Sequence, residues 1–89
     1  MPGRYRIEFA PAAKRDLTAL PPEMIKRVDT RILALAENPR PPGVEKLVGP
    51  ESFYRVRVGD YRIIYQIEDD RFIVLVIRIR HRREVYRSL

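Results

Sequence analysis

Several residue types that often mark a function are missing or scarce in this chain of 89 residues. There is no cysteine, so no disulfide, thiolate metal site or cysteine nucleophile is available. The single histidine leaves only scattered carboxylates for a metal, so we expect no metal site and no cofactor. The longest apolar run, residues 72–77, is too short to cross a bilayer, and residues 1–9 lack the apolar core of a secretory signal. These absences predict a soluble, cytoplasmic protein.

Positive charge is what the chain has in excess. Eighteen Lys and Arg residues against twelve Asp and Glu give a net charge of +6. Only three of the cations are lysines, so arginine dominates. Guanidinium groups bind phosphate oxygens in pairs and stack on bases. The composition therefore favours a polyanionic partner, with nucleic acid as the first choice.

Apolar periodicity predicts the element order β-α-α-β-β-β-β. Residues 5–9 alternate as a strand, and two helices over 11–20 and 22–37 are separated by Pro21-Pro22 and stopped at Asn38-Pro39. A short strand follows at 44–48. Three longer strands are predicted at 53–58, 61–67 and 72–79. The order predicts a single α+β domain over residues 1–89: an N-terminal strand and an antiparallel two-helix hairpin packed on one face of a mostly antiparallel four- to five-stranded sheet, with a short C-terminal helical tail over 80–89.

The dipeptide Gly59-Asp60 sets the register of the central hairpin. A two-residue turn there places Arg57 opposite Arg62, and Arg55 lies on the same face because strand side chains alternate. The opposite face is continuous and apolar and needs the helices to cover it: Tyr54, Val56, Val58, Tyr61, Ile63, Tyr65 and Ile67.

The last strand is placed by a three-residue turn over 68–70. This turn pairs Ile67 with Arg71 and Arg62 with Val76. It adds two further arginines, Arg78 and Arg80, to the arginine side of the sheet, because the alternative two-residue turn would bury Arg78 under the helices. The residues then predicted to face the helices are Ile73, Leu75, Ile77 and Ile79.

Clustered arginines on a sheet need an explanation. Like charges directly opposed across strands destabilise a sheet by up to about 1 kcal/mol, so folding alone does not call for them. One reading is an ordinary solvated face. The other is a site for an anion that is absent from the chain itself, and phosphate is the anion that guanidinium groups fit best.

Two motifs resemble those of a known family. The run FYRVRVGDYRIIY at 53–65, together with HRREVY at 81–86, is similar to the RelE family of bacterial and archaeal toxins. The resemblance covers nearly the whole chain. It implies ribosome-dependent cleavage of messenger RNA in the decoding A site, by attack of a ribose 2′-OH on the adjacent phosphate. It also implies two partners, a cognate acidic antitoxin and the 70S ribosome with its A-site message.

The resemblance implies a role for several side chains. It matches Arg55 and Arg57 to the family's phosphate-binding basic pair and Arg62 to its transition-state arginine. A tail arginine that assists the leaving group matches Arg82 or Arg83, between which a local deletion leaves the choice open. The substrate-orienting tyrosine matches Tyr86, which as an amphipathic residue could equally anchor a terminal helix.

One departure from the family pattern concerns the general base. The family has lysines where this chain has Arg55 and Arg57, and a guanidinium stays protonated near neutral pH. The base must then come from another residue or from the ribosome. Glu45 and His81 are the candidates, since related toxins such as YoeB use a glutamate and a histidine at similar places. Glu45 could instead be a strand-surface residue, and His81 a solvated residue of the tail.

Two other functions fit the same scaffold. A ParE-like toxin would act on DNA gyrase through protein contacts, and a non-catalytic relative would bind RNA without cutting it. Fold does not separate these activities, because function depends on the site. The arginine cluster and the tail at 81–86 favour RNA.

Overall fold

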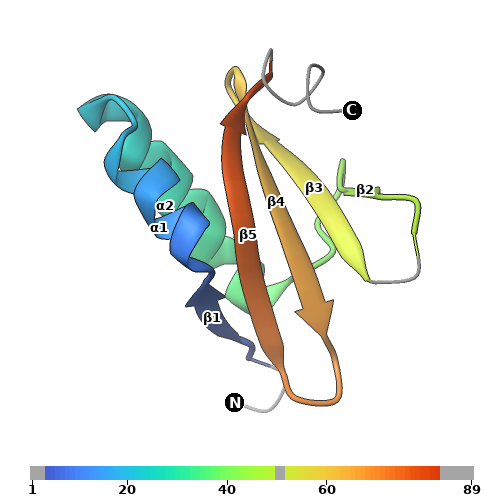
Figure 1. The fold of residues 1–89 in the computed structure, drawn as a ribbon. Coiled ribbons are helices and arrows are strands. Elements are labelled where there is room, and N and C mark those ends of the chain that lie inside the picture. The colour runs from blue at the N-terminus through green and yellow to red at the C-terminus, as the bar shows by residue number, and fades with distance from the viewer. Residues whose placement is uncertain (1–3, 50–51, 83–89) are drawn as a thin grey trace.

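A computed structural model gives the fold and describes residues 4–49 and 52–82. The described elements follow the predicted order β-α-α-β-β-β-β (Figure 1). They are β1 (Arg6–Phe9), α1 (Pro11–Thr18), α2 (Pro22–Glu37), β2 (Glu45–Lys46), β3 (Phe53–Val58), β4 (Tyr61–Glu68) and β5 (Ile73–His81).

Proline sets the helix boundaries. Each helix carries a proline in its first turn, where the missing N–H has no intrahelical partner to lose. α2 ends at Glu37, because Asn38 is extended and precedes Pro39. The apolar stripe of α2 is buried as its spacing predicts, at Val28, Ile32 and Leu35.

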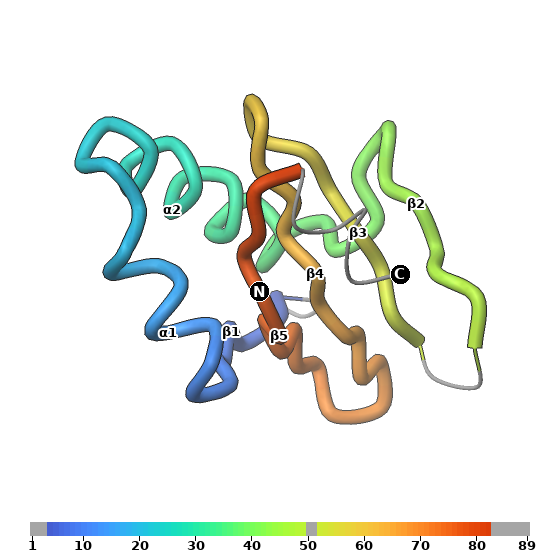
Figure 2. The backbone as a smooth tube through the Cα atoms, turned by 45° about the horizontal axis from the view of Figure 1, so that its top comes forward, coloured from blue at the N-terminus to red at the C-terminus, as the bar shows by residue number. Residues whose placement is uncertain are grey.

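The strands form one five-stranded sheet in the order β1-β5-β4-β3-β2. β1 runs parallel to β5, and every other neighbouring pair is antiparallel. Both helices lie on one face of the sheet (Figures 1 and 2), α1 against β5 and α2 against β1 and β3. The predicted α+β architecture, with helices on one side of a mostly antiparallel sheet, is confirmed.

The predicted register of the β3–β4 hairpin is also confirmed. Val58 lies opposite Tyr61, and Arg57 lies opposite Arg62. Gly59, with φ of 59°, starts the turn as a type II′ arrangement requires, and the apolar face of the hairpin belongs to the core.

The predicted register of β4 with β5 is wrong. The connection is four residues long, 69–72, so that Ile67 lies opposite Val74 and Arg62 lies opposite Arg80. Two features that periodicity does not reveal cause the difference. Phe72 adopts a positive φ of 53°, which extends the turn, and a β-bulge leaves Ile77 without a partner between the pairs Tyr65–Val76 and Ile64–Arg78.

The bulge changes which β5 side chains face the helices. Before it, Val74 and Val76 lie in the core, so the predicted inward positions of Ile73 and Leu75 are wrong. After the bulge, Ile79 lies in the core as predicted. Arg78 and Arg80 point to the opposite face, where they lie across from Ile64 and Arg62 of β4. β5 also continues through His81, two residues beyond its predicted end.

A polar network ties the β4–β5 turn to the loop after α2. The Asp69 carboxylate accepts a hydrogen bond of 2.6 Å from the Tyr5 hydroxyl and two, of 3.2 and 2.7 Å, from the Arg40 guanidinium. Arg40 also lies over the Tyr54 ring, 5.2 Å from its centroid. The Tyr65 hydroxyl donates to the carbonyl of Pro39, and burial raises the pKa of Tyr65 to about 12. These contacts fix the end of the sheet opposite the Gly59 turn.

Two predicted elements differ in extent from the described structure. The predicted short strand at 44–48 contains only two strand residues, Glu45–Lys46. The predicted helical tail begins with residues that belong to β5, and its remainder, 83–89, lies outside the described residues. Within the described part of the chain, neither helix is long and apolar enough to cross a membrane.

Candidate functional site

Three arginines form a continuous row across the sheet. Arg57 of β3 lies opposite Arg62 of β4, which in turn lies opposite Arg80 of β5. Opposed residues point to the same side, and each of the three arginines has at least one strand neighbour in the core under the helices, so this row lies on the helix-free side. We call this side, with its five predicted arginines, the arginine face: Arg55, Arg57, Arg62, Arg78 and Arg80.

Arg62 occupies the middle of the row on a central strand. Its side chain is half-buried, and its Nη1 is shielded from solvent and has no hydrogen-bond partner. Buried donors in folded proteins nearly always have an acceptor, and an unsatisfied one is costly. Arg62 therefore has a buried donor at the centre of the face that an acceptor from a ligand could satisfy.

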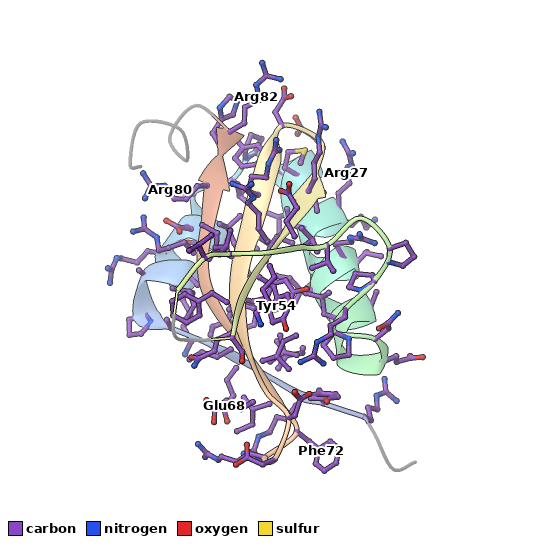
Figure 3. All side chains as sticks on the ribbon, turned by 90° about the vertical axis from the view of Figure 1, so that its right-hand side faces the viewer. Arg27, Tyr54, Glu68, Phe72, Arg80 and Arg82 are labelled. Atoms are coloured by element: carbon purple, nitrogen blue, oxygen red, sulfur yellow. The ribbon has the colours of Figure 1, made fainter. Side chains whose placement is uncertain are left out.

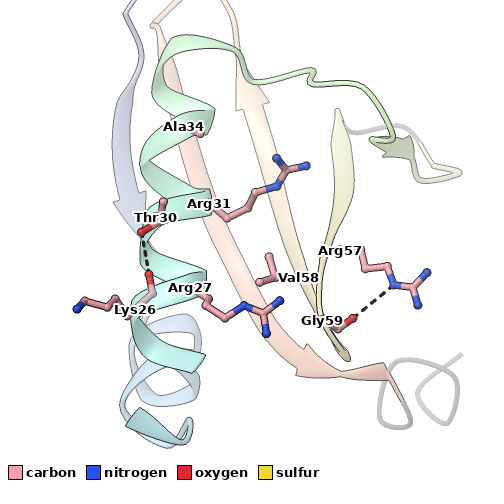
Figure 4. Close-up of a pocket in the computed structure, with 8 residues that line it drawn as sticks. All are labelled: Lys26, Arg27, Thr30, Arg31, Ala34, Arg57, Val58 and Gly59. Atoms are coloured by element: carbon pink, nitrogen blue, oxygen red, sulfur yellow. Dashed lines mark hydrogen bonds between the residues drawn. The ribbon is translucent and has the colours of Figure 1, made fainter. Parts of the chain in front are cut away.

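Arg57 lies beside it at the edge of the hairpin. Its Nε donates only to the carbonyl of Gly59, at a long distance of 3.4 Å, and the side chain is exposed. Figure 4 shows the guanidinium pointing away from α2. The sequence predicts that Arg55, Arg57 and Arg62 converge without neutralising carboxylates. This fits Arg57 and Arg62, for which the described residues give no ion pair, but not Arg55.

Arg55 is bound differently. Its Nε and Nη2 donate to the Glu45 carboxylate at 3.0 and 2.8 Å, and Glu45 lies directly opposite it on β2. The Arg55 side chain is 20% exposed, whereas that of Glu45 is 63% exposed. The structure thus brings the candidate base Glu45 to the arginine face, where most of its side chain is exposed.

Arg78 is held toward α1. Its Nε and Nη2 donate to the Asp16 carboxylate at 2.8 and 3.3 Å, and the backbone N–H of Ile79 donates to the same carboxylate. Burial alone would raise the pKa of Asp16, but these donors outweigh it and hold that pKa below its usual value. The ion pair anchors α1 on β5, so the structure gives Arg78 an internal role that its sequence position did not predict.

His81 lies on the other side of the sheet from the row of three. It is opposite Tyr61, and the two rings meet edge to face with centroids 5.3 Å apart. His81, Tyr61 and Asp16 line a cavity of about 190 Å³ between α1 and the end of β5. The structure does not bring the predicted histidine base together with the arginine face.

The predicted tail residues are only partly described. Arg82 follows β5, and its backbone N–H donates to the carbonyl of Asp60 at 2.7 Å, which ties it to the hairpin turn. Figure 3 shows Arg80 and Arg82 toward one end of the sheet, with Phe72 at the other. Arg83 and Tyr86 lie outside the described residues.

A basic groove beside the hairpin was missed by the sequence reasoning. Lys26, Arg27 and Arg31 lie on the polar side of α2 and line an open cavity of about 640 Å³ together with residues 57–59 (Figure 4). The spacing of Arg27 and Arg31 by one helical turn is a sequence signal for one face, but only the fold places that face against β3.

Possible metal ligands do not gather in the described part of the chain. No group of three or more His, Cys, Asp or Glu residues there is arranged to hold a metal ion.

Comparison with known proteins identifies the family. The family model described as "ParE toxin of type II toxin-antitoxin system, parDE" matches residues 7–86. The chain belongs to the RelE/ParE family of toxins of type II toxin–antitoxin systems. Toxin RelG of Mycobacterium tuberculosis is 31% identical over 84 residues, which cover 93% of this chain and 97% of RelG.

Other members of the RelE/ParE family give the comparison more detail. The mRNA interferase toxin RelE of Escherichia coli is 28% identical over 92% of this chain and 90% of its own. The archaeal RelE–RelB complex of Pyrococcus horikoshii contains a similar chain, with a TM-score of 0.80 and 27% identity over 89% of this chain and 96% of that one. The family resemblance and the RelE-like fold inferred from the sequence are confirmed.

Proposed function

We propose that this toxin is a ribosome-dependent endoribonuclease that cleaves messenger RNA in the A site and so inhibits translation. The observation that carries the proposal is the row Arg57–Arg62–Arg80, with a buried, unsatisfied Nη1 on its central member. A phosphodiester supplies the acceptor that the Arg62 Nη1 lacks. The name of the Escherichia coli relative, mRNA interferase toxin RelE, supports the same chemistry.

The proposed reaction is an internal transfer at one phosphate. The ribose 2′-oxygen loses its proton to a base and bonds to phosphorus, the bond from phosphorus to the 5′-oxygen breaks, and the 5′-oxygen takes up a proton. A cyclic phosphate and a 5′-hydroxyl result. Because the nucleophile belongs to the substrate, the proposal requires no metal ion and no cofactor. Arg57 and Arg62 would stabilise the charge that develops on the phosphate oxygens.

Glu45 is the better-placed candidate for the base. Its carboxylate lies on the arginine face and is held by Arg55, whereas His81 lies beyond the sheet next to α1. A base must come within hydrogen-bond reach of the proton that it removes. We propose Glu45 for that role, Arg55 and Arg80 as further phosphate ligands, Arg82 or Arg83 for leaving-group assistance, and Tyr86 for orienting the substrate.

We further propose an acidic antitoxin and the 70S ribosome as partners. The related chain from Pyrococcus horikoshii was crystallised as a RelE–RelB complex. The net charge of +6 suits an acidic protein as well as RNA, so an antitoxin could neutralise the toxin by covering its cationic surface. A ribosomal target would place the activity in the cytoplasm.

The substitution Arg62→Ala tests the proposed reaction. Removing a donor that stabilises transition-state charge costs on the order of 10²–10³ in rate. We expect a loss of that size in cleavage of a defined message on purified ribosomes, measured by primer extension, while circular dichroism shows a folded protein.

Arg71→Ala is the matched control. It removes the same charge from an exposed side chain in the β4–β5 turn, at the opposite end of β4 from Arg62. Cleavage should stay within about twofold of the unchanged protein. Full activity in Arg62→Ala, or an equal loss in both variants, would contradict the proposed role of the arginine face.

The gyrase alternative has one observation in its favour, the ParE description of the matching family model. Supercoiling by purified gyrase in the presence of the toxin separates the two functions. Inhibited supercoiling together with intact message on ribosomes would favour the ParE-like activity. Binding to ribosomes with neither effect would identify a non-catalytic RNA-binding protein.

A further inference from the structure

We propose that the groove between α2 and β3 is a second RNA-binding element, which holds phosphates of the message next to the one on the arginine face. We call it the α2 groove, lined by Lys26, Arg27, Thr30, Arg31, Ala34, Arg57, Val58 and Gly59. This inference rests on the proposed function, because it assumes that an RNA strand lies on the arginine face.

The shape of the groove comes from helix spacing. Arg27 and Arg31 lie one turn apart on α2, and Thr30 and Ala34 form a second row of small side chains beside them. Figure 4 shows both arginines extending from α2 toward β3. Because Thr30 and Ala34 have small side chains, they leave space in the groove. Its volume of about 640 Å³ is enough for several atoms of a nucleic-acid backbone.

The charge of the groove is uncompensated. Among the residues that the structure describes, no carboxylate lines the groove, and neither Lys26 nor Arg31 is paired with an acidic residue. Elsewhere in those ranges, six arginines each have a carboxylate within salt-bridge distance: Arg4, Arg6, Arg40, Arg55, Arg71 and Arg78.

Arg31 adds a second, independent observation. Its Nε is shielded from solvent and has no hydrogen-bond partner. Arg31 lines the groove, so an acceptor from a bound ligand can reach this buried, unsatisfied donor. A phosphate oxygen provides such an acceptor and also neutralises the charge.

The groove is continuous with the arginine face. β2 pairs only with residues 54 and 55 of β3, so the edge of β3 at residues 56–58 is uncovered in the described sheet. Arg57 lines the groove, and its guanidinium points to the other side of that edge (Figure 4). At Gly59, which has no side chain, the Arg27 guanidinium lies against the hairpin turn, 3.5 Å from the position that a Cβ would take.

This continuity favours RNA over a peptide. An acidic peptide could neutralise the charge of the groove. An RNA strand, however, has a phosphate at every nucleotide, so it can offer a phosphate to each cation from Arg62 on the arginine face to Arg31 in the groove. The proposed path thus predicts a footprint longer than the cleaved dinucleotide.

The test compares RNA oligonucleotides of two lengths that carry a 2′-deoxy sugar at the cleavage position, so that binding is measured without cutting. The variant K26Q/R27Q/R31Q removes the three cations that α2 contributes. A control, K14Q/R15Q/R71Q, removes three exposed cations from α1 and the β4–β5 turn. Affinity is measured by fluorescence anisotropy at several salt concentrations.

We expect the groove variant to bind the long oligonucleotide at least tenfold more weakly at low salt. Its slope of log K against log salt should fall by about 2, because each lost single-strand phosphate contact contributes about 0.7. Binding of a trinucleotide, which covers only the arginine face, should change less than twofold. The control variant should match the unchanged protein with both oligonucleotides.

Two outcomes would overturn the proposal. One is an equal loss for the short and long oligonucleotides, or for the groove and control variants, which would mean a general effect of charge. The other is unchanged RNA binding together with lost co-purification of an acidic antitoxin, which would make the groove a peptide site.

Because no cleavage is measured, this test is separate from that of the proposed function. A toxin that leaves message intact on ribosomes could still show the length-dependent loss. Conversely, if the protein cleaves message but its groove variant binds both oligonucleotides normally, the proposed function stands and the proposed role of the α2 groove is contradicted.

Discussion

The arginines of this chain differ in what they contact, and the contact decides what each can do. Arg40 and Arg78 donate to internal carboxylates and fasten one element to another. Arg62 has a buried donor atom with no acceptor, which folding does not reward. Two arginines on the same face can therefore have different roles, one structural and one ligand-binding. Only the residues that each arginine contacts in the fold distinguish the two roles.

Asp69 gives a prediction at this scale. Hydrogen bonds from Arg40 and Tyr5 lower the pKa of Asp69 to about 2, from an ordinary 3.8. Folding thus favours its ionised form, so this carboxylate stabilises the fold above about pH 4 and loses that contribution as the pH falls toward 2. The side chain is 54% exposed, so we expect less than about 1 kcal/mol.

Thermal unfolding between pH 5 and pH 2 measures this contribution. Asp69→Asn should lower the melting temperature slightly at pH 5 and flatten its decline below pH 4. The adjacent Asp70→Asn is the control, because the structure pairs Asp70 with no cation in the described ranges. Equal pH profiles for the two variants would contradict the role assigned to Asp69.

Among the elements, the β3–β4 hairpin does most to build the site, and it is also the part that the sequence predicts best. A glycine-first, two-residue turn allows one register, and that register brings Arg57 opposite Arg62. The β4–β5 turn could not be placed in the same way, because a phenylalanine with positive φ carries no sequence signal.

Gly59→Ala tests the dependence of the hairpin on its turn. Alanine at a φ of 59° is strained, although its Cβ would meet the Arg27 guanidinium and the Met24 Cε only at ordinary distances of 3.5 and 3.6 Å. We expect a loss of about 1–3 kcal/mol in the free energy of unfolding. Chemical denaturation measures it, with Asp60→Ala, whose φ is not positive, as the control. An unchanged free energy in Gly59→Ala would show that the turn has another conformation.

For the molecule as a whole, the sequence predicts the charge and the hairpin register better than it predicts which residues lie together at the site. Net charge and the hairpin register were sufficient to predict an arginine face. They could not predict the capture of Arg78 by Asp16, the position of His81 beside α1 or the α2 groove, because each depends on where a helix lies against the sheet. Long-range packing is not encoded in local periodicity.

Ligand-induced stabilisation is a prediction at the scale of the whole molecule. A ligand that binds only the folded state at 100 times its dissociation constant adds about 2.7 kcal/mol. For a domain of this size, uncleavable RNA should then raise the melting temperature by about 10–20 °C. The rise should shrink in high salt.

The double variant R57Q/R62Q should lose most of this rise, since it removes two adjacent cations from the arginine face. A K14Q/R71Q variant of equal net charge serves as the control and should keep the rise. If both variants lost it equally, RNA would be recognising overall charge rather than the row of arginines.

The β-bulge in β5 has a consequence for comparing members of the family. Ile77 is the extra residue, and the pairs on both sides of it, Tyr65–Val76 and Ile64–Arg78, would remain intact if it were absent. A relative could therefore gain or lose one residue at this position and still direct the arginine after it toward the same face. A gap in an alignment at position 77 would change the length of the strand and leave the arginines on the same face, whereas a gap at position 79 would turn Arg80 toward the helices.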